Sequence, residues 1–218
     1  MTPTDAVRPR LRGLYAVTPD DPDTARLVAH VTAAVRGGAA IVQYRNKAAP
    51  PPLRERQAAA LAQACRAHGA LFVVNDDARI ARDVGADGVH VGEDDGELAA
   101  ARARVGAGIV GVSCYNDLAR AQRAAEAGAD YVAFGSFFAS TVKPNARRAG
   151  LDLLASAGPL GLPRVAIGGI TLDNAPALVE AGADALAVIS AVFASGDPAQ
   201  IERAARGFAA LFVVPCRP

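Results

Sequence analysis

Lysine is nearly absent from this chain, although cations are not. Of the 23 basic side chains only Lys47 and Lys143 are lysine, and all the others are arginine. The two residue types replace each other at many surface positions, but an ammonium is compact and strongly hydrated whereas a guanidinium is planar. The two lysines therefore mark either positions that need an ammonium or two survivors by chance. Their polar neighbours favour the first interpretation.

The chain also lacks the features of several protein classes. Its formal net charge is only +1, so no broad positive field favours nucleic acid or an anionic membrane. No apolar run is long enough to cross a bilayer, and residues 1–12 have no apolar core like that of a signal peptide. Cys65, Cys114 and Cys216 are scattered without metal-ligand spacing. We expect a cytoplasmic enzyme that has no nucleic-acid or membrane partner.

Short apolar runs alternate with longer stretches of helical period along the whole chain. We expect helices, for example, at residues 53–65, 118–127 and 174–180. The expected strands are residues 14–17, 41–44, 71–74, 88–91, 109–113, 131–134, 165–167 and 185–189. Strict alternation predicts a parallel sheet with right-handed crossovers, and eight units in about 200 residues match the smallest (β/α)8 barrels.

Glycine marks the entry to every second expected strand. The repeated segments are Gly37-Gly38-Ala39-Ala40, Gly85-Ala86-Asp87, Gly128-Ala129-Asp130 and Gly182-Ala183-Asp184. An open doubly wound sheet is the structural alternative, but no Gly-x-Gly-x-x-Gly follows the first strand. We therefore predict an α/β protein with a single (β/α)8 TIM barrel at residues 13–212. Residues 1–12 would be a flexible N-terminal segment and 213–218 a C-terminal tail.

Polar residues follow the expected strands, where barrel enzymes carry their catalytic groups. Gln43, Arg45 and Lys47 alternate after the second strand, so a period of two projects all three to one side. Three converging donors suit a multiply charged phosphate ester. The alternative is an exposed polar strand end without a ligand.

Carboxylates follow the third and fourth expected strands. Asp76 and Asp95 are the expected ligands of one Mg2+ ion, because this ion takes one or two carboxylates together with waters and phosphates. Asp77 and Asp94 are expected to cap the helices that follow. The alternative is that all four residues are caps.

A second anion site is expected after the last two strands. Gly168-Gly169 and Ser190 stand there, and the loops after strands seven and eight are the usual phosphate site of a barrel. The alternative is a tight turn. Two anion sites in one barrel mouth imply two phosphorylated substrates or one bisphosphate.

These residues together resemble the thiamine phosphate synthase family over almost the whole chain. The motifs that carry the resemblance are Gln43-Tyr44-Arg45-Asn46-Lys47, Val74-Asn75-Asp76, residues 85–92 with Asp95, Gly111-Val112-Ser113, Lys143, Ile167-Gly168-Gly169-Ile170 and Val188-Ile189-Ser190. The resemblance implies a barrel that joins a hydroxymethylpyrimidine diphosphate to a thiazole phosphate, or to its carboxylated form, and releases pyrophosphate. It also implies one Mg2+ per subunit, two phosphorylated small-molecule substrates and a dissociative substitution.

The resemblance also assigns roles by position. It implies that the metal ligands are Asp76 and Asp95. The implied pyrimidine-diphosphate residues are Gln43, Tyr44, Arg45, Asn46, Lys47, Asn75, Ser113 and Lys143, of which Arg45, Lys47, Ser113 and Lys143 would be catalytic. The implied thiazole-phosphate residues are Ser140, Thr141, Val142, Gly169, Ile189 and Ser190. The sequence leaves open whether the chain forms a homo-oligomer.

A few positions depart from the family's pattern. Val142 stands where threonine is frequent and Glu93 where glutamine is common, and Cys114-Tyr115 replaces a more polar pair. The Cys114 thiol is expected to pack rather than to react. His90 lies in the middle of an expected strand, so we interpret it as a core histidine and not as a base.

Three other functions compete with coupling. A thiazole tautomerase of the same barrel family would share the thiazole-phosphate site but would need no diphosphate cluster. An epimerase or isomerase would need a base of matched pKa in the pocket, and no histidine or lone carboxylate is placed for one. A non-catalytic thiazole-phosphate-binding barrel would have no use for a complete set of metal ligands.

The lysines give the first testable prediction. We expect Lys47→Arg and Lys143→Arg each to lower kcat/KM for the coupling reaction, with arginine falling between wild type and alanine. A planar guanidinium cannot reproduce three freely rotating donors around a diphosphate. Loss of one charge-assisted bond costs about 1.5–3 kcal/mol, or roughly ten- to a hundredfold in rate. Wild-type rates in both arginine variants would show that the lysines survive by chance.

Overall fold

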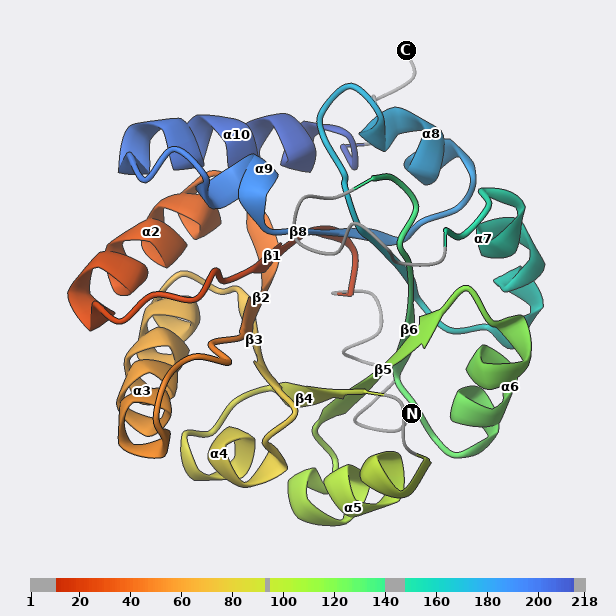
Figure 1. Ribbon diagram of the computed structural model, residues 1–218, viewed down its shortest axis with the longest axis horizontal. Helices are drawn as coiled ribbons and strands as arrows, with labels where there is room; N and C mark the ends of the chain where they lie inside the picture. The colour runs from red at the N-terminus through yellow and green to blue at the C-terminus, as the bar shows by residue number, and fades with distance from the viewer. Residues whose placement is uncertain (1–10, 93–94, 140–147, 214–218) are drawn as a thin grey trace.

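Eight parallel strands close into a barrel that is surrounded by helices in this computed structural model (Figure 1). The structure describes residues 11–92, 95–139 and 148–213, and of residues 95 and 96 the backbone alone. Each strand pairs in parallel with the next, and β8 closes the barrel by pairing with β1. The predicted (β/α)8 TIM barrel is confirmed.

The strands lie close to their predicted positions. They are β1 (Gly13–Val17), β2 (Ala39–Tyr44), β3 (Leu71–Asn75), β4 (Gly88–Val91), β5 (Ile109–Tyr115), β6 (Tyr131–Phe134), β7 (Arg164–Ile167) and β8 (Ala185–Val188). The helices are α2 (Thr24–Arg36), α3 (Pro51–Ala67), α4 (Ala78–Asp83), α5 (Asp95–Val105), α6 (Leu118–Glu126), α7 (Asp152–Ser156), the 3-10 turn η2 (Gly158–Leu160), α8 (Ala175–Glu180), α9 (Ser190–Phe193) and α10 (Pro198–Ala210).

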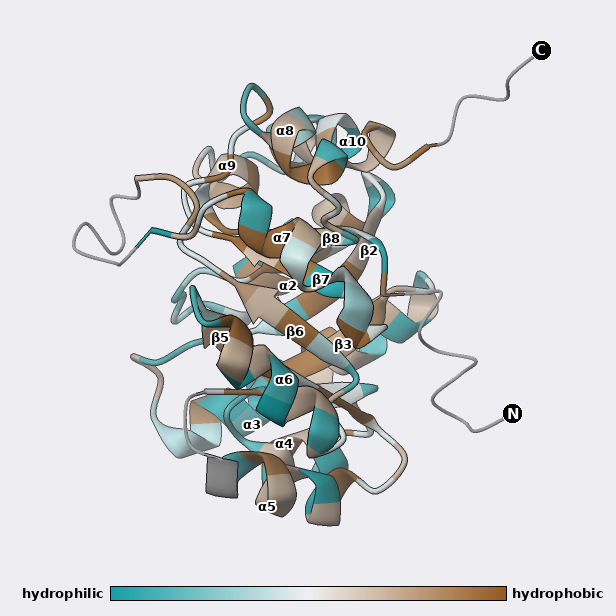
Figure 2. Ribbon diagram, turned by 90° about the vertical axis from the view of Figure 1, so that its right-hand side faces the viewer, coloured by the Kyte–Doolittle hydropathy of each residue, from teal (hydrophilic) through white to brown (hydrophobic). Residues whose placement is uncertain are grey.

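Alternate strand residues build two separate apolar clusters. One cluster joins the strands to the helices, and it includes Leu27 of α2 and Leu61 of α3. The other contains no residue of a helix, and its members, such as Tyr15, Ile41 and Val165, stand at every second strand position. The second cluster therefore fills the inside of the barrel. Figure 2 shows the largely hydrophobic strands at the centre and hydrophilic residues on the surrounding helices.

The predicted glycine entries are confirmed by the backbone. Gly38, Gly85, Gly128 and Gly182 have φ values of 100°, 64°, 87° and 102°, a region that side-chain-bearing residues avoid. Each glycine lets the chain leave a helix and turn into β2, β4, β6 or β8.

The predicted domain boundaries can be compared with the first and last described elements. The last helix, α10, ends at Ala210. Leu11 is buried in the inner cluster, so packing already begins before residue 13. The boundaries 1–12, 13–212 and 213–218 otherwise stay predictions, because residues 1–10 and 214–218 lie outside the described part of the chain. None of the described helices has the length and apolar character needed to cross a membrane.

Gly111 makes room for Tyr131, one of the two tyrosines inside the barrel. It lies on β5 next to Tyr131 of β6, and the two residues are in register. A Cβ atom on Gly111 would overlap the ring and the hydroxyl oxygen of Tyr131, and Tyr131 is completely buried. The absent side chain of Gly111 is therefore what allows a tyrosine across the barrel interior.

We expect Gly111→Ala to destabilise the protein because the methyl group must displace a buried ring. Overpacking of this kind costs about 1–3 kcal/mol, which urea unfolding followed by circular dichroism would measure. Gly158→Ala is the matched control, since its Cβ would meet only Arg164 at 3.4 Å on an exposed turn. Equal stability losses in the two variants would contradict the packing argument.

Candidate functional site

Successive side chains at the end of β2 lie on opposite faces of the barrel sheet. The strand ends at Tyr44, so the convergence of Gln43, Arg45 and Lys47 on one side stays a prediction. Gln43 is buried and donates from Nε2 to the hydroxyl of Tyr15 at 2.8 Å. Tyr15 belongs to the inner cluster, so Gln43 faces the barrel interior. Tyr44 belongs to the outer cluster and donates to Oε1 of Gln57 on α3 at 2.9 Å. Gln43 therefore faces the barrel interior, whereas the next residue, Tyr44, anchors the strand to α3.

The cations Arg45 and Lys47 are held by the loop that follows β1. Thr18 accepts from the Arg45 backbone N–H at 2.9 Å and donates to the Arg45 carbonyl at 3.0 Å. The Asp20 carboxylate accepts from the Lys47 backbone N–H at 2.9 Å and lies 3.7 Å from the Arg45 guanidinium. The β1 loop thereby fixes the backbone that carries both cations, and Asp20 moderates their charge.

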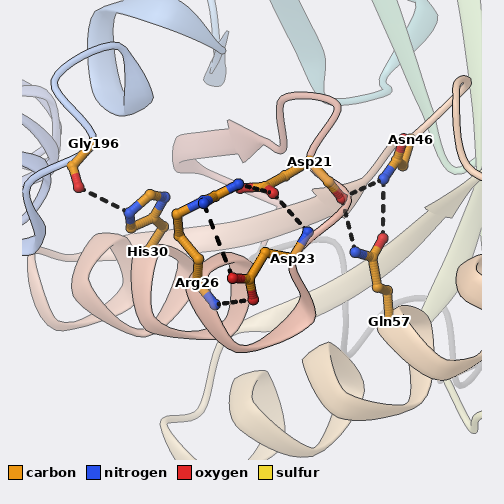
Figure 3. A network of polar contacts seen from close by, with 7 residues as sticks. All are labelled: Asp21, Asp23, Arg26, His30, Asn46, Gln57 and Gly196. Carbon is orange, nitrogen blue, oxygen red and sulfur yellow. Dashed lines mark hydrogen bonds and ion pairs between the residues drawn. The ribbon is translucent and has the colours of Figure 1, made fainter.

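A buried polar network supports the same segment from the helix side (Figure 3). Asn46 donates to the Asp21 carbonyl at 2.8 Å and to Gln57 at 3.0 Å, and Gln57 donates to that same carbonyl at 2.8 Å. Arg26 holds the Asp21 carboxylate with two bonds of 2.8 and 2.6 Å and lowers the pKa of that carboxyl. Because a low carboxyl pKa stabilises the fold above the unfolded pKa, this contribution is lost as the pH falls.

The Tyr44 hydroxyl and the Asn46 amide nitrogen thus have hydrogen-bond partners within the protein. Both were predicted to bind the pyrimidine diphosphate, and the structure gives them anchoring contacts to Gln57 and Asp21. Both also line a small pocket between the ends of β2 and β3. Their contact with a ligand stays a prediction.

This pocket, which we call the β2–β3 pocket, gathers charges of both signs. The Lys47 ammonium lies 3.6 Å from the Asp76 carboxylate, with both side chains more than half exposed. Asn75 and Arg54 also line the β2–β3 pocket, and Nε of Arg54 is buried without a hydrogen-bond partner. Arg54 was not predicted as a site residue, because an arginine in a helical segment such as α3 is typical of a surface position.

Asp76 has a backbone conformation that is unusual for a residue with a side chain. Its φ is 63°, and its N–H donates to the His90 carbonyl at 2.8 Å. Asp77 accepts from the Ile80 N–H at 2.9 Å and caps α4, as predicted. The two adjacent carboxylates therefore differ in their contacts: Asp77 caps a helix, whereas Asp76 pairs with Lys47.

An exposed carboxylate beside an amide suits a hard cation with few protein ligands. Asp76 supplies the carboxylate oxygens and Asn75 an amide at the same strand end, which is the oxygen chemistry that Mg2+ prefers. Asp95 begins α5, the helix after β4, so its backbone lies at the same end of the barrel as Asp76. The Asp95 side chain, Glu93 and Asp94 lie outside the described residues. Among the described side chains no group of three metal-ligating residues occurs.

Ser113 ends a hydrogen-bonded chain that crosses the barrel interior. Its hydroxyl lies 2.8 Å from Nε2 of His90, and Nδ1 of His90 lies 2.9 Å from the hydroxyl of Tyr131. Tyr131 in turn meets the hydroxyl of Tyr15 at 2.7 Å, and Tyr15 accepts from Gln43. Two predicted site residues, Gln43 and Ser113, are therefore connected through the core.

Burial keeps the middle of this chain neutral. It lowers the pKa of His90 to about 4 despite the opposing charge of Asp76. Burial also raises the pKa of Tyr15 to about 12, against the opposing effect of its hydrogen bonds, and raises the pKa of Tyr131. His90 is thus a buried core histidine, as expected, but one with both ring nitrogens engaged.

The expected thiazole-phosphate site is described only in part. Gly169 has a φ of 64°, and a Cβ there would overlap the backbone of Phe138 and Ala139. Ile189 packs on the inner cluster, and Ser190 begins α9, directly beyond the end of the neighbouring strand. Ser140, Thr141, Val142 and Lys143 lie outside the described residues. The glycine is therefore required by the turn itself, whichever ligand binds there.

The two cysteines in the described part of the chain, Cys65 and Cys114, are both buried. Cys114 is completely buried in the outer cluster, and burial raises the pKa of its thiol to about 12. Cys65 has the same surroundings and the same upward shift of its pKa. The expectation that Cys114 packs rather than reacts agrees with both observations.

A closed (β/α)8 barrel with cations, carboxylates and amides at its strand ends defines an enzyme whose site lies at the carboxyl end of the barrel. Residues 14–192 match the family described as thiamine monophosphate synthase. The chain belongs to this family. It is accordingly a transferase of thiamine biosynthesis.

Known relatives agree over nearly the whole chain. The thiamine-phosphate synthase of Chromobacterium violaceum is 55% identical over 201 residues, which cover 92% of this chain and 97% of that protein. The enzyme of the same name from Xanthomonas campestris pv. campestris is 56% identical over 89% of this chain and 94% of its own length. The solved thiamine phosphate pyrophosphorylase of Pyrococcus furiosus superposes with a TM-score of 0.82 at 35% identity, covering 94% of this chain and 96% of that chain.

We expect Gln57→Leu to weaken the support of the Arg45–Lys47 segment. The change leaves the Tyr44 hydroxyl without its buried partner and removes one of the two donors to the Asp21 carbonyl, which keeps Asn46. Loss of a buried partner costs about 1–3 kcal/mol. Urea unfolding should show the lower stability, and steady-state kinetics should show a raised KM for the substrate that this segment binds. Gln63→Leu, on an exposed position of the same helix, is the control. A raised KM in the control as well would count against a specific anchoring role.

Proposed function

We propose that this enzyme couples 4-amino-2-methyl-5-(diphosphooxymethyl)pyrimidine with 4-methyl-5-(2-phosphoethyl)thiazole, or its carboxylated form, to give thiamine phosphate and pyrophosphate. The observation that carries the proposal is the β2–β3 pocket, where Lys47 and Asp76 lie 3.6 Å apart at the same strand ends as Arg45 and Asn75. A tautomerase that takes only the thiazole phosphate would have no use for such a cluster.

Residues of β2 and β5 would bind the diphosphate. Arg45, Lys47, Lys143 and the Ser113 hydroxyl would donate to its oxygens, and Gln43 would hold the pyrimidine end. In the reaction the bond between the methylene carbon and the diphosphate oxygen breaks first, and pyrophosphate carries the electron pair away. These cations stabilise the charge that develops on the leaving oxygen more than they stabilise the bound substrate, and this difference lowers the barrier.

Asp76 and Asp95 would hold one Mg2+ ion beside the diphosphate. When bound, the ion adds positive charge that neutralises the leaving group. Lys47 already sits against Asp76 in an exposed pair, and such pairs contribute at most about 1 kcal/mol. The pair can therefore open at little cost and turn the ammonium toward a phosphate oxygen.

The second substrate would be held by its own phosphate. Gly169, Ile189 and Ser190 at the ends of β7 and β8, with Ser140, Thr141 and Val142, would bind that group. The thiazole nitrogen then attacks the methylene cation with its lone pair and forms the new carbon–nitrogen bond. This step needs no protein nucleophile, because positioning two bound substrates replaces a bimolecular encounter.

A two-substrate assay tests the proposal. The purified protein with Mg2+ should release one pyrophosphate for each thiamine phosphate formed, measured by chromatography and by a coupled phosphate assay. Both products should vanish when either substrate is omitted. Conversion of the thiazole phosphate between tautomers without pyrophosphate release would identify a tautomerase and overturn the proposal.

We expect Asp76→Asn to raise the Mg2+ concentration for half-maximal activity by about tenfold or more, as loss of groups around a metal does. Asparagine removes the charge and still accepts the positive φ of this position. The measurement is initial rate against Mg2+ concentration.

Asp77→Asn is the matched control for this substitution. It neutralises the adjacent carboxylate, but asparagine remains a good helix cap, so the Mg2+ dependence should stay that of the wild type. A shift of the Mg2+ dependence in Asp77→Asn, or none in Asp76→Asn, would assign the metal to other residues.

A further inference from the structure

A continuous hydrogen-bonded chain runs across the barrel interior. It leads from Gln43 on β2 through Tyr15 on β1, Tyr131 on β6 and His90 on β4 to Ser113 on β5, with contacts of 2.8, 2.7, 2.9 and 2.8 Å. Tyr15 and Tyr131 are at most 1% exposed, and Gln43 and His90 less than a tenth. Resemblance assigns roles to the two ends of this chain, but to none of the three residues between them.

With Gln43 as the first donor, only one direction of the chain gives every proton a partner. Nε2 of Gln43 has no lone pair to offer, so Tyr15 accepts from it. The Tyr15 proton then has Tyr131 as its partner, and the Tyr131 proton has Nδ1 of His90. A neutral imidazole carries a single N–H. That N–H is therefore on Nε2, and Ser113 accepts it.

We propose that this chain orients the Ser113 hydroxyl so that its proton faces the barrel mouth. Tyr131 and His90 are then positioning residues for Ser113. The inference rests on the proposed function, in which Ser113 meets an anionic diphosphate substrate. An anion needs a donor, and a serine whose oxygen is already occupied by the His90 N–H has its own proton free for the ligand.

If the hydrogen bonds of the chain ran in the opposite direction, Ser113 would offer the substrate an acceptor instead of a donor. If Gln43 presented its carbonyl oxygen to Tyr15, each proton would shift along the chain, and Nδ1 of His90 would carry the hydrogen. Ser113 would then donate to His90 and present only lone pairs to the mouth, which repel a phosphate oxygen. The tautomer of His90 therefore reports which group Ser113 offers to the substrate.

The tautomer is measurable by long-range proton–nitrogen correlation spectra of protein with 15N-labelled histidine. His90→Gln identifies the His90 signals by their loss. We expect the proton on Nε2 in the wild type. Tyr15→Phe should keep that tautomer, because Tyr131 still donates to His90, whereas Tyr131→Phe should give a mixture. The two variants remove the same kind of buried hydroxyl, so each controls for the other.

A double-mutant cycle connects the tautomer to the substrate. Tyr131→Phe should lower kcat/KM by about two- to fivefold, the factor by which the competent orientation is depopulated. In a Ser113→Ala background the same change should have no further effect, because the hydroxyl that it orients is gone. A purely structural role of Tyr131 would lower kcat/KM by the same factor in both backgrounds.

The outcomes separate this inference from the function on which it rests. A proton on Nδ1 in the wild type overturns the inference, and so does an additive cycle; the wild-type spectrum alone decides if Tyr131→Phe does not fold. A folded wild type that fails to couple the two substrates overturns the proposed function instead. In that case the Nε2 tautomer would still support the direction of the chain.

Discussion

Alternation of side chains along strands of a closed barrel is the constraint on which the other features depend. Parallel strands that pair all the way round leave only an inside and an outside. At the end of β2 this puts Gln43 in the barrel and Tyr44 against α3. The residues that anchor the strand and the residues that face the mouth are therefore neighbours in the sequence. A shift of one residue in register would exchange the two sets.

The inside of the barrel holds polar groups only where they satisfy one another. Four buried side chains and Ser113 form one chain of hydrogen bonds, since an unpaired polar atom in such a core would cost more than the bond contributes. Gly111 creates the space for Tyr131. The packing of the core and its chain of hydrogen bonds therefore depend on the same place, where Tyr131 lies against Gly111 and contacts Tyr15 and His90.

The charges of the mouth are arranged differently from those of the core. Lys47 and Asp76 are exposed and weakly paired, whereas their backbones are held by Asp20 and by the His90 carbonyl. Backbones held by hydrogen bonds, with exposed side chains that can change partners, suit the proposed binding of a multiply charged substrate and release of pyrophosphate. Catalysis by charge stabilisation depends on such preorganisation more than on any single reactive group.

The sequence by itself determined the barrel, because each local signal agreed with the next: apolar runs, helical periods and glycine entries all had one consistent solution. It also placed Gln43, Arg45, Lys47 and Asp76 at strand ends, since strand period and order suffice for that. Only the tertiary structure decided that Asn46 is anchored to the Asp21 carbonyl and that His90 connects Ser113 to Tyr131. These contacts join residues far apart in the chain, and no local pattern specifies which buried polar groups will face each other when eight strands close.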